Sequence, residues 1–140
     1  MHIFFSGIGG AGIGPLALIA KQAGFEVSGS DKKESQYTEY LKKHGINLYI
    51  GQTEQNISKI QTTKQIDWFV YSSALPFENP NHPELIFVKE NNIKHSKRDE
   101  FLSFFLNEKN FKLIAIAGTH GKTTTTAMAI WAFKQLNIPL

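Results

Sequence analysis

Residues 2–12 read His-Ile-Phe-Phe-Ser-Gly-Ile-Gly-Gly-Ala-Gly, and this stretch decides the fold class that the sequence predicts. The apolar run from His2 to Ser6 is typical of a short buried strand, and Gly7 to Gly12 follows it as a Gly-x-Gly-x-x-Gly loop. Glycines at this spacing allow a tight turn into a helix and let the backbone approach a phosphate closely. The alternative is that they only permit close packing of the helix on the strand.

The residues after the glycine loop continue this pattern. Apolar residues at helical spacing predict a helix that Gly24 can end: Ile13, Leu16, Ala17, Ala20 and Ala23. Residues 26–29 then predict a second strand with Asp31 at its carboxyl end, roughly where a dinucleotide-binding fold places an acid near a ribose. Asp31 also suits a turn or a helix cap ahead of Lys32 and Lys33, so both interpretations stay open.

Strands and helices keep alternating as far as residue 106. Helices are predicted over residues 35–44, 55–60, 83–91 and 98–106. Strands are predicted over residues 46–50, 66–71 and 94–96. The last helix is expected to bury Phe101, Leu102, Phe105 and Leu106, and residues 72–76 are expected to form a loop at the sheet edge that binds ligands. The sequence therefore predicts an α/β fold, a Rossmann-like parallel sheet with helices on both faces.

A second glycine motif lies in residues 112–125, Lys-Leu-Ile-Ala-Ile-Ala-Gly-Thr-His-Gly-Lys-Thr-Thr-Thr. The apolar run predicts a buried strand, the glycines a phosphate-binding loop and the threonines the start of a helix. Lys122 would contact the β- and γ-phosphates of a nucleoside triphosphate, and the Thr123 hydroxyl would hold Mg²⁺. The motif is shortened, because Ile116 occupies the position of its first glycine. The alternative is an ordinary glycine turn followed by a solvated lysine.

The polar segment 107–110, Asn-Glu-Lys-Asn, is the one convincing linker in the sequence. It predicts a first domain over residues 1–107 and, over residues 108–140, the strand, loop and helix of a second, incomplete domain. One strand and one helix cannot bury a hydrophobic core alone. We therefore expect the second part to pack on the first, on another chain or on a larger domain. The end of the chain just past a helix is typical of a truncation.

Composition limits the classes of function. Hydrophobic residues make up 41% of the chain, which supports a folded core, and the absence of cysteine excludes disulfides, thiolate metal sites and cysteine nucleophiles. The five histidines lack metal-ligand spacing, so no structural zinc is expected. Scattered lysines give the net charge of +3, which does not argue for nucleic-acid binding. Without an apolar run of about 20 residues or a signal peptide, we expect a soluble cytoplasmic protein with no membrane partner.

Five segments resemble, in their order, the N-terminal part of the Mur ligase family: residues 7–12, 28–31, 71–74, 79–80 and 117–125. The last segment, Ala-Gly-Thr-His-Gly-Lys-Thr-Thr-Thr, is highly specific. The resemblance implies a Rossmann-like first domain that binds the UDP part of a substrate, followed by the beginning of a central ATPase domain. Gln52 departs from the family pattern, which usually has histidine there, and no role is assigned to it.

The resemblance also implies roles for individual residues. Those implied to bind the UDP substrate are Gly7, Ile8, Gly9, Gly10, Ala11, Gly12, Ser30, Asp31, Ser72, Ser73 and Ala74. Those implied to bind ATP are Gly118, Thr119, His120, Gly121, Lys122, Thr123 and Thr124. Lys122 and Thr123 would be catalytic, because Lys122 and a Mg²⁺ ion held by Thr123 would offset charge on the transferring phosphoryl group.

The implied reaction joins L-alanine to the carboxylate of UDP-N-acetylmuramate through an acyl phosphate in peptidoglycan synthesis, with ATP and Mg²⁺ as cofactors. The L-alanine site is expected outside this sequence, so these residues alone are expected to bind the UDP substrate without ligating it. Alternatives are the related ligase that attaches a recycled tripeptide, an NAD-dependent oxidoreductase, and a non-catalytic module that self-associates through residues 111–140. The sequence predicts neither the oligomeric state nor the amino-acid selectivity.

Overall fold

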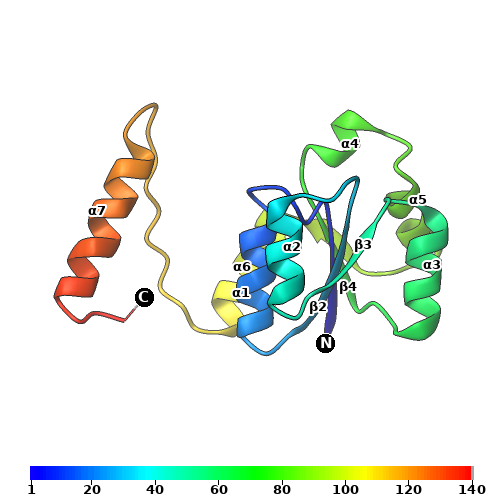
Figure 1. Cartoon of the computed structure of the whole chain (residues 1–140), viewed down its shortest axis with the longest axis horizontal. Coiled ribbons are helices and arrows are strands. Elements are labelled where there is room, and N and C mark those ends of the chain that lie inside the picture. The colour runs from blue at the N-terminus through cyan, green and yellow to red at the C-terminus, as the bar shows by residue number, and fades with distance from the viewer. Residues whose placement is uncertain (140) are drawn as a thin grey trace. The chain divides into compact units, whose positions relative to one another are not determined.

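The computed structural model describes residues 1–139 and divides the chain into two compact units, Met1–Lys109 and the part from Asn110 onward (Figure 1). The first unit holds a five-stranded sheet and the helices that cover it, and the second holds one helix among its described residues. No helix within residues 1–139 has the length and apolar character needed to cross a membrane.

The sheet places its first strand where the strand order reverses. The order is β3-β2-β1-β4-β5, and every pair of neighbours is parallel. The strands are β1 (His2–Ser6), β2 (Glu26–Asp31), β3 (Asn47–Ile50), β4 (Trp68–Tyr71) and β5 (His95–Lys97). The chain builds outward from β1 to β2 and β3 on one side and then returns to β4 on the other. Such a reversal opens a crevice outside the carboxyl end of the central strand.

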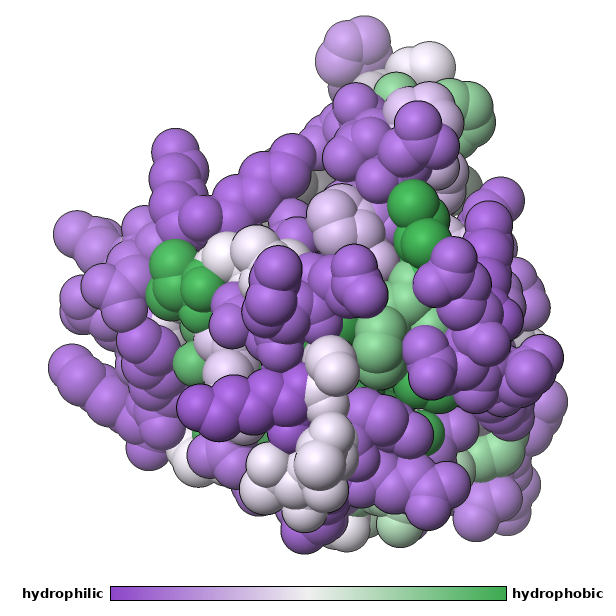
Figure 2. Space-filling view, turned by 90° about the vertical axis from the view of Figure 1, so that its right-hand side faces the viewer, coloured by the Kyte–Doolittle hydropathy of each residue, from purple (hydrophilic) through white to green (hydrophobic). Residues whose placement is uncertain are grey.

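Helices cover both faces of the sheet, which confirms the predicted fold class. The helices of the first unit are α1 (Gly14–Gln22), α2 (Gln36–Lys43), α3 (Glu54–Thr63), α4 (Leu75–Glu78), α5 (Pro83–Glu90) and α6 (Arg98–Glu108). Successive side chains of a strand point to opposite faces, so Ile3 and Phe5 pack with α1, α2 and α6, whereas Phe4 packs with α3 and α5. Figure 2 shows a mostly hydrophilic surface with isolated apolar side chains, as expected for an outer layer of helices.

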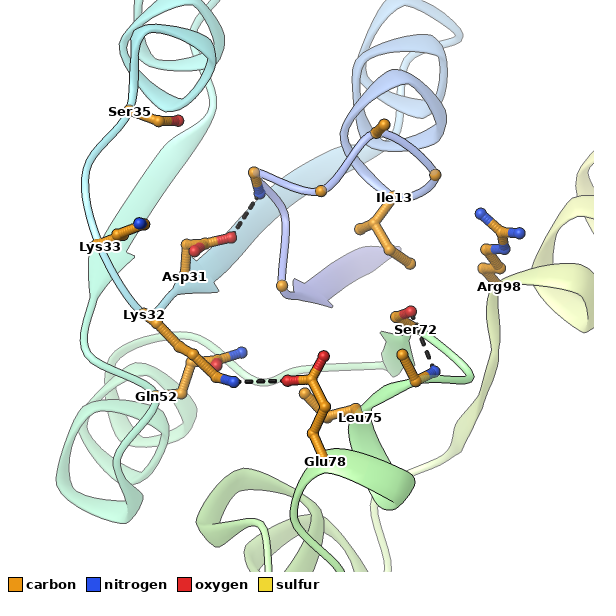
Figure 3. Close-up of a pocket in the computed structure, with 16 residues that line it drawn as sticks. Ile13, Asp31, Lys32, Lys33, Ser35, Gln52, Ser72, Leu75, Glu78 and Arg98 are labelled. Atoms are coloured by element: carbon orange, nitrogen blue, oxygen red, sulfur yellow. Dashed lines mark hydrogen bonds and ion pairs between the residues drawn. The ribbon is translucent and has the colours of Figure 1, made fainter.

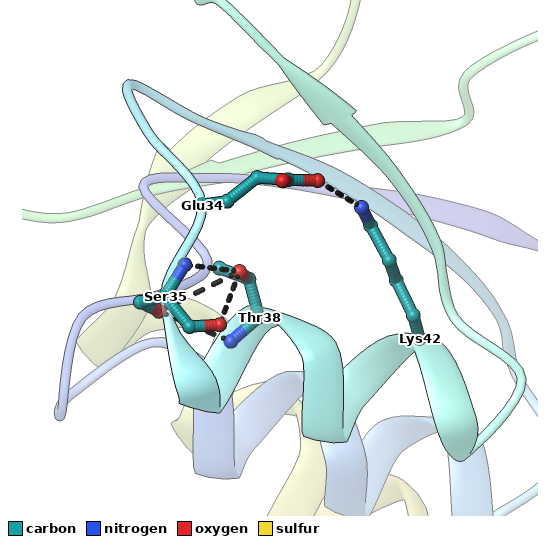
Figure 4. Close-up of polar contacts among 4 residues, drawn as sticks. All are labelled: Glu34, Ser35, Thr38 and Lys42. Atoms are coloured by element: carbon teal, nitrogen blue, oxygen red, sulfur yellow. Dashed lines mark hydrogen bonds and ion pairs between the residues drawn. The ribbon is translucent and has the colours of Figure 1, made fainter.

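A capping box fixes the start of α2 (Figure 4). The Ser35 hydroxyl accepts a hydrogen bond from the Thr38 backbone N–H at 3.1 Å, and the Thr38 hydroxyl accepts one from the Ser35 N–H at 2.8 Å. Lys42 also forms a 2.6 Å ion pair with Glu34, and exposed pairs of this kind contribute at most about 1 kcal/mol. The cap therefore determines where the loop after β2 ends.

The apolar face of α6 differs from the predicted one. Phe101 and Phe105 are buried as expected, whereas Leu102 is 38% exposed. Phe104 packs edge-on against Trp68 instead, with 4.9 Å between the ring centroids. Residues three and four apart share one side of a helix, so the aromatic residues at 101, 104 and 105 form a stripe that Leu102 does not join.

The strand predicted at the start of the second unit is wrong for this structure. Residues 111–118 have no regular secondary structure, although α7 (Lys122–Gln135) follows as predicted. A strand needs a neighbour to pair its backbone groups, and the described residues of this unit supply none. Leu113 and Ile114 are each 64% exposed, and no described residue from 110 onward is buried. This exposure agrees with the expectation that these residues cannot bury a core alone.

One carboxyl group lies in the core of the first unit. Glu84, the second residue of α5, has no exposed surface, and its Oε2 accepts a 2.6 Å hydrogen bond from the Ser6 hydroxyl. Burial raises the pKa of Glu84 from 4.5 to about 7, against the effect of the nearby Ser30 and Ser6 hydroxyls, and the Asp31 charge adds to the rise. Ser30 Oγ and Glu84 Oε1 make no hydrogen bond within residues 1–139, so Ser6 alone holds the carboxyl group.

Glu84→Gln is expected to change how stability depends on pH. A carboxyl group with a raised pKa favours the folded state while it is protonated, so its contribution is present below pH 4.5 and is lost as the pH rises to about 7. The lost contribution is about 3 kcal/mol, which a neutral amide would keep. Urea titrations measure the unfolding free energy of each protein. The value for the variant minus the value for the parent should rise by about 3 kcal/mol between about pH 5 and about pH 8.

The parent protein is the matched reference for this experiment. Burial, and then the Lys32 charge, lower the pKa of His82. The contribution of His82 to the folding stability therefore decreases as the pH falls. His82 is common to both proteins, and its effect cancels in the difference between them. Parallel pH profiles for parent and variant would contradict a raised pKa at Glu84.

Candidate functional site

A pocket of about 460 Å³ lies at the carboxyl end of β1 in the first unit (Figure 3). Its walls come from the glycine loop after β1, from the segments that follow β2, β3 and β4, and from the first residue of α6. Parallel strands end at the same edge of the sheet, so loops that are far apart in the sequence meet there. This is the edge at which the sequence predicted a ligand crevice.

The glycine loop is folded against the end of β2. The N–H groups of Gly7 and Ile8 both donate to the Ser30 carbonyl oxygen at 2.9 Å, and Gly7 has a positive φ of 75° that favours glycine. The Gly9 N–H donates to Asp31 Oδ2 at 2.7 Å, and a Cβ atom on Gly9 would lie 2.8 Å from that oxygen. Asp31 therefore holds the loop in place, and its close approach requires glycine at position 9.

Most residues that the sequence assigned to the UDP substrate meet at this pocket. Those that line it are Gly7, Gly9, Gly10, Ala11, Gly12, Asp31, Ser72 and Ala74. Ile8 is fully buried in the core, and Ser30 is buried because it and Asp31 point to opposite sides of β2. Ser73 is exposed outside the pocket wall. Ile8, Ser30 and Ser73 are thus not brought to the pocket, and the binding roles of the others stay predictions.

Several polar residues of the pocket were not expected from the sequence. They are Lys32, Lys33, Ser35, Gln52, Glu78 and Arg98. Most of them lie within a few residues of the carboxyl end of a strand, and this position in the sequence is an indication that a residue lines the ligand crevice. That indication is weak, because polar loop residues are common at any protein surface. Glu78 was also obscured because it belongs to α4, whereas the sequence predicted a loop at the start of that segment.

An ion pair spans the pocket. Lys32 Nζ, just after β2, lies 2.6 Å from Glu78 Oε2 on α4 (Figure 3). The hydrogen bond from Lys32, and then its charge, lower the pKa of Glu78. Both side chains are more than half exposed, so water weakens the pair. An anionic ligand can therefore compete with Glu78 for Lys32.

A chain of hydrogen bonds connects the buried acid to the pocket. Gln52 Nε2 donates to the Ser6 hydroxyl at 2.9 Å, and that hydroxyl donates to Glu84 Oε2 at 2.6 Å. Ser6 has a single hydroxyl proton, which is directed at Glu84, so it can only accept from Gln52. This direction fixes the amide of Gln52 and leaves its oxygen available to a ligand.

The second glycine motif forms a turn, and the side chain of Lys122 in the same motif donates hydrogen bonds to the backbone of that turn. The residues predicted to bind ATP meet in this turn and in the first turn of α7: Gly118, Thr119, His120, Gly121, Lys122, Thr123 and Thr124. Gly118 and Gly121 have positive φ angles of 153° and 79°, and Gly121 is the N-cap of α7. Lys122 Nζ donates to the carbonyl oxygens of Gly118 and Thr119 at 2.6 and 3.2 Å. The loop and helix of the motif thus form without the strand expected before them.

The threonines after Lys122 differ in what their hydroxyls bind. Thr126 Oγ1 donates to the Lys122 carbonyl oxygen at 2.8 Å, whereas the Thr123 hydroxyl makes no hydrogen bond within residues 1–139. No cluster of three or more His, Asp or Glu side chains able to hold a metal ion occurs in the part of the chain that the structure describes. A Mg²⁺ ion on Thr123 would therefore need phosphate oxygens, water or further residues as its other ligands.

Residues 2–110 match the family model described as Mur ligase family, catalytic domain. Among curated relatives, the UDP-N-acetylmuramate--L-alanine ligase of Caldicellulosiruptor bescii is 44% identical over 135 residues, which make up 96% of this chain and 27% of the relative. The ligase of the same name from Clostridium perfringens is 43% identical over 126 residues, 90% of this chain and 25% of the relative. The chain spans about a quarter of the length of these relatives.

Solved structures lead to the same family. UDP-N-acetylmuramate-alanine ligase MurC from Thermotoga maritima aligns with a TM-score of 0.84 and 30% identity, over 98% of this chain and 30% of that one. UDP-N-acetylmuramate:L-alanyl-gamma-D-glutamyl-meso-diaminopimelate ligase (MPL) from Neisseria meningitides aligns with a TM-score of 0.82 and 31% identity, over 95% of this chain and 39% of that one.

UDP-glucose 4-epimerase from Bifidobacterium longum, solved with NAD⁺ and UDP, is a more distant match. It aligns with a TM-score of 0.54 and 17% identity, over 69% of this chain and 36% of that one, which shows a shared fold alone. The family match covers the whole sheet and every loop of the pocket. This chain belongs to the Mur ligase family.

Proposed function

We propose that this chain provides the UDP-substrate pocket and the triphosphate-binding loop of an ATP-dependent ligase that joins L-alanine to UDP-N-acetylmuramate. The observation that carries the proposal is the pocket at the carboxyl end of β1, where a glycine loop, Asp31 and several cations meet in a member of the Mur ligase family. The curated relatives support this reaction, because they are named for it. We place the reaction in the cytoplasm, where ATP and free amino acids are available.

The pocket suits a nucleoside diphosphate in size and charge. Its volume of about 460 Å³ lies within the usual range for small-ligand sites, about 300–1,000 Å³. Lys32, Lys33 and Arg98 line it, and the glycine loop offers backbone that a phosphate can approach closely. Asp31 binds the Gly9 N–H through one carboxylate oxygen, so its other oxygen can accept a hydrogen bond from a ribose hydroxyl.

Residues 118–124 would hold the triphosphate. Bound ATP with Mg²⁺ supplies the phosphoryl group that activates the muramate carboxylate. Lys122 would exchange the Gly118 and Thr119 carbonyl oxygens for phosphate oxygens and offset their charge, and Thr123 would hold Mg²⁺ through its hydroxyl. The loop needs a paired strand to orient it, and residues 111–118 form none, so we expect no ligation by this chain alone.

The ligase that attaches a recycled tripeptide is the second candidate. The observation in its favour is the MPL structure, which is as similar to this chain as the MurC structure is. Both proteins are named for UDP-N-acetylmuramate, so one pocket would serve either reaction. Assays of a full-length enzyme with L-alanine and with the tripeptide would separate the two candidates.

Asp31→Asn should weaken UDP binding about tenfold, because a hydrogen bond to a charged group is worth about 1.5–3 kcal/mol and the amide keeps part of it. Isothermal titration calorimetry of the 140-residue chain with UDP, and separately with NAD⁺, measures this effect and tests the oxidoreductase alternative. Tight binding of NAD⁺ without binding of UDP would contradict the proposal.

Asp67→Asn is the matched control for this titration. Asp67 also accepts a backbone N–H through Oδ2, from His2 at 2.6 Å, but it lies at the amino end of β1, away from the pocket. The control should therefore bind UDP as the parent chain does. Equal losses in Asp67→Asn and Asp31→Asn would indicate that the loss reflects folding rather than contact with the ribose.

Lys122→Ala in a full-length enzyme should lower the rate of UDP-N-acetylmuramoyl-alanine formation at least about a hundredfold, which is the usual effect of removing a transition-state charge partner. The affinity for UDP-N-acetylmuramate should stay unchanged, since Lys122 is not part of its pocket. Lys134→Ala, at the other end of α7, is the control and should retain the parent rate. Near-normal turnover by Lys122→Ala would remove Lys122 from the mechanism.

A further inference from the structure

Arg98 is a charged residue of the pocket to which the proposed function assigns no specific task. It is the first residue of α6, it is exposed, and its side chain extends towards the glycine loop (Figure 3). Its guanidinium makes no hydrogen bond or ion pair within residues 1–139. Lys32, another cation of the pocket, is by contrast paired with Glu78.

The position of Arg98 is unfavourable for the helix itself. The amino end of a helix carries partial positive charge, which disfavours a cation there and favours acids such as Asp99 and Glu100 in the same turn. Neither acid forms an ion pair with Arg98. Helix stability therefore does not explain an arginine at this position, and residues that break a local preference are often found at functional sites.

The guanidinium lies on the backbone of the glycine loop. A Cβ atom on Gly12 would be 1.6 Å from Arg98 Nη1, so any other residue at position 12 would displace this group. Gly12 does not have a positive φ, and backbone conformation therefore does not require glycine there. The flexible end of the Arg98 side chain is the group that a side chain at position 12 would have to displace.

Building on the proposed function, we propose that Arg98, seated on Gly12, forms an anion subsite that binds the distal phosphate of the UDP ligand. Asp31 and Arg98 lie on opposite sides of the glycine loop (Figure 3). A ribose on Asp31 directs the first phosphate to the loop and the second towards Arg98. The planar guanidinium matches two phosphate oxygens at once, which a lysine cannot do.

The test compares UDP with UMP, which lacks the distal phosphate, by isothermal titration calorimetry of the 140-residue chain. Arg98→Gln should weaken UDP binding about tenfold to a hundredfold, as expected for lost charged hydrogen bonds, and should change UMP binding less than about twofold. Arg98→Lys should be intermediate for UDP. Lys97→Gln, which removes the neighbouring charge outside the pocket, should bind both ligands as the parent chain does.

Gly12→Ala provides a second, independent variant. Its Cβ atom should push the guanidinium off the loop, so Gly12→Ala combined with Arg98→Gln should bind UDP no more weakly than Arg98→Gln alone. Fully additive losses in the double variant would overturn the shared subsite.

The outcomes separate this inference from the proposed function. If the parent chain binds UDP and Arg98→Gln binds it equally well, or loses UDP and UMP equally, the distal-phosphate subsite is wrong and the UDP pocket stands. If the parent chain binds neither ligand, both proposals are overturned. Unchanged melting temperatures for Arg98→Gln and Lys97→Gln are expected, because neither side chain makes a hydrogen bond or ion pair within residues 1–139.

Discussion

The parallel pairing of β1 between β2 and β4 is the constraint on which the rest of the structure depends. The register sets Ser6 opposite Ser30 on one side and opposite Tyr71 on the other, so these strands end together. The loops that leave them are consequently held at one edge of the sheet. The pairing is secured by aromatic packing on both faces, with Phe4 stacked on Phe69 and Phe5 edge-on to Phe101.

Because of this alignment, the pocket contains polar side chains that other protein groups hold in place and polar side chains that a ligand can bind. Asp31 is held by the Gly9 N–H and Gln52 by the Ser6 hydroxyl, which in turn is held by the buried Glu84. Groups with such partners keep their orientation when a ligand arrives, and this lowers the entropy lost on binding. Arg98 makes no hydrogen bond or ion pair within residues 1–139, so its charge is available to an anion.

The second unit shows which features of the second glycine motif form without a paired strand before it. The turn, the N-cap at Gly121 and the hydrogen bonds of Lys122 all involve residues within four positions of one another, so they form locally. Met128 and Trp131 of α7 are each 66% exposed and line an apolar groove of about 420 Å³. Apolar surface of this kind is normally covered in a complete domain.

The sequence by itself determined the strands and helices of the first unit other than α4, together with the two glycine motifs. Apolar spacing and glycine positions predicted the parallel sheet, its helices and the crevice after β1, because strand and helix periods are written in neighbouring residues. The sequence could not show that Phe104 packs against the core in place of Leu102, that Ile8 and Ser30 turn inward, or that Lys32, Gln52 and Arg98 join the pocket. Nor could it show that residues 111–118 stay unpaired. Those features were decided by tertiary structure, since burial and strand pairing depend on partners that lie far away in the chain.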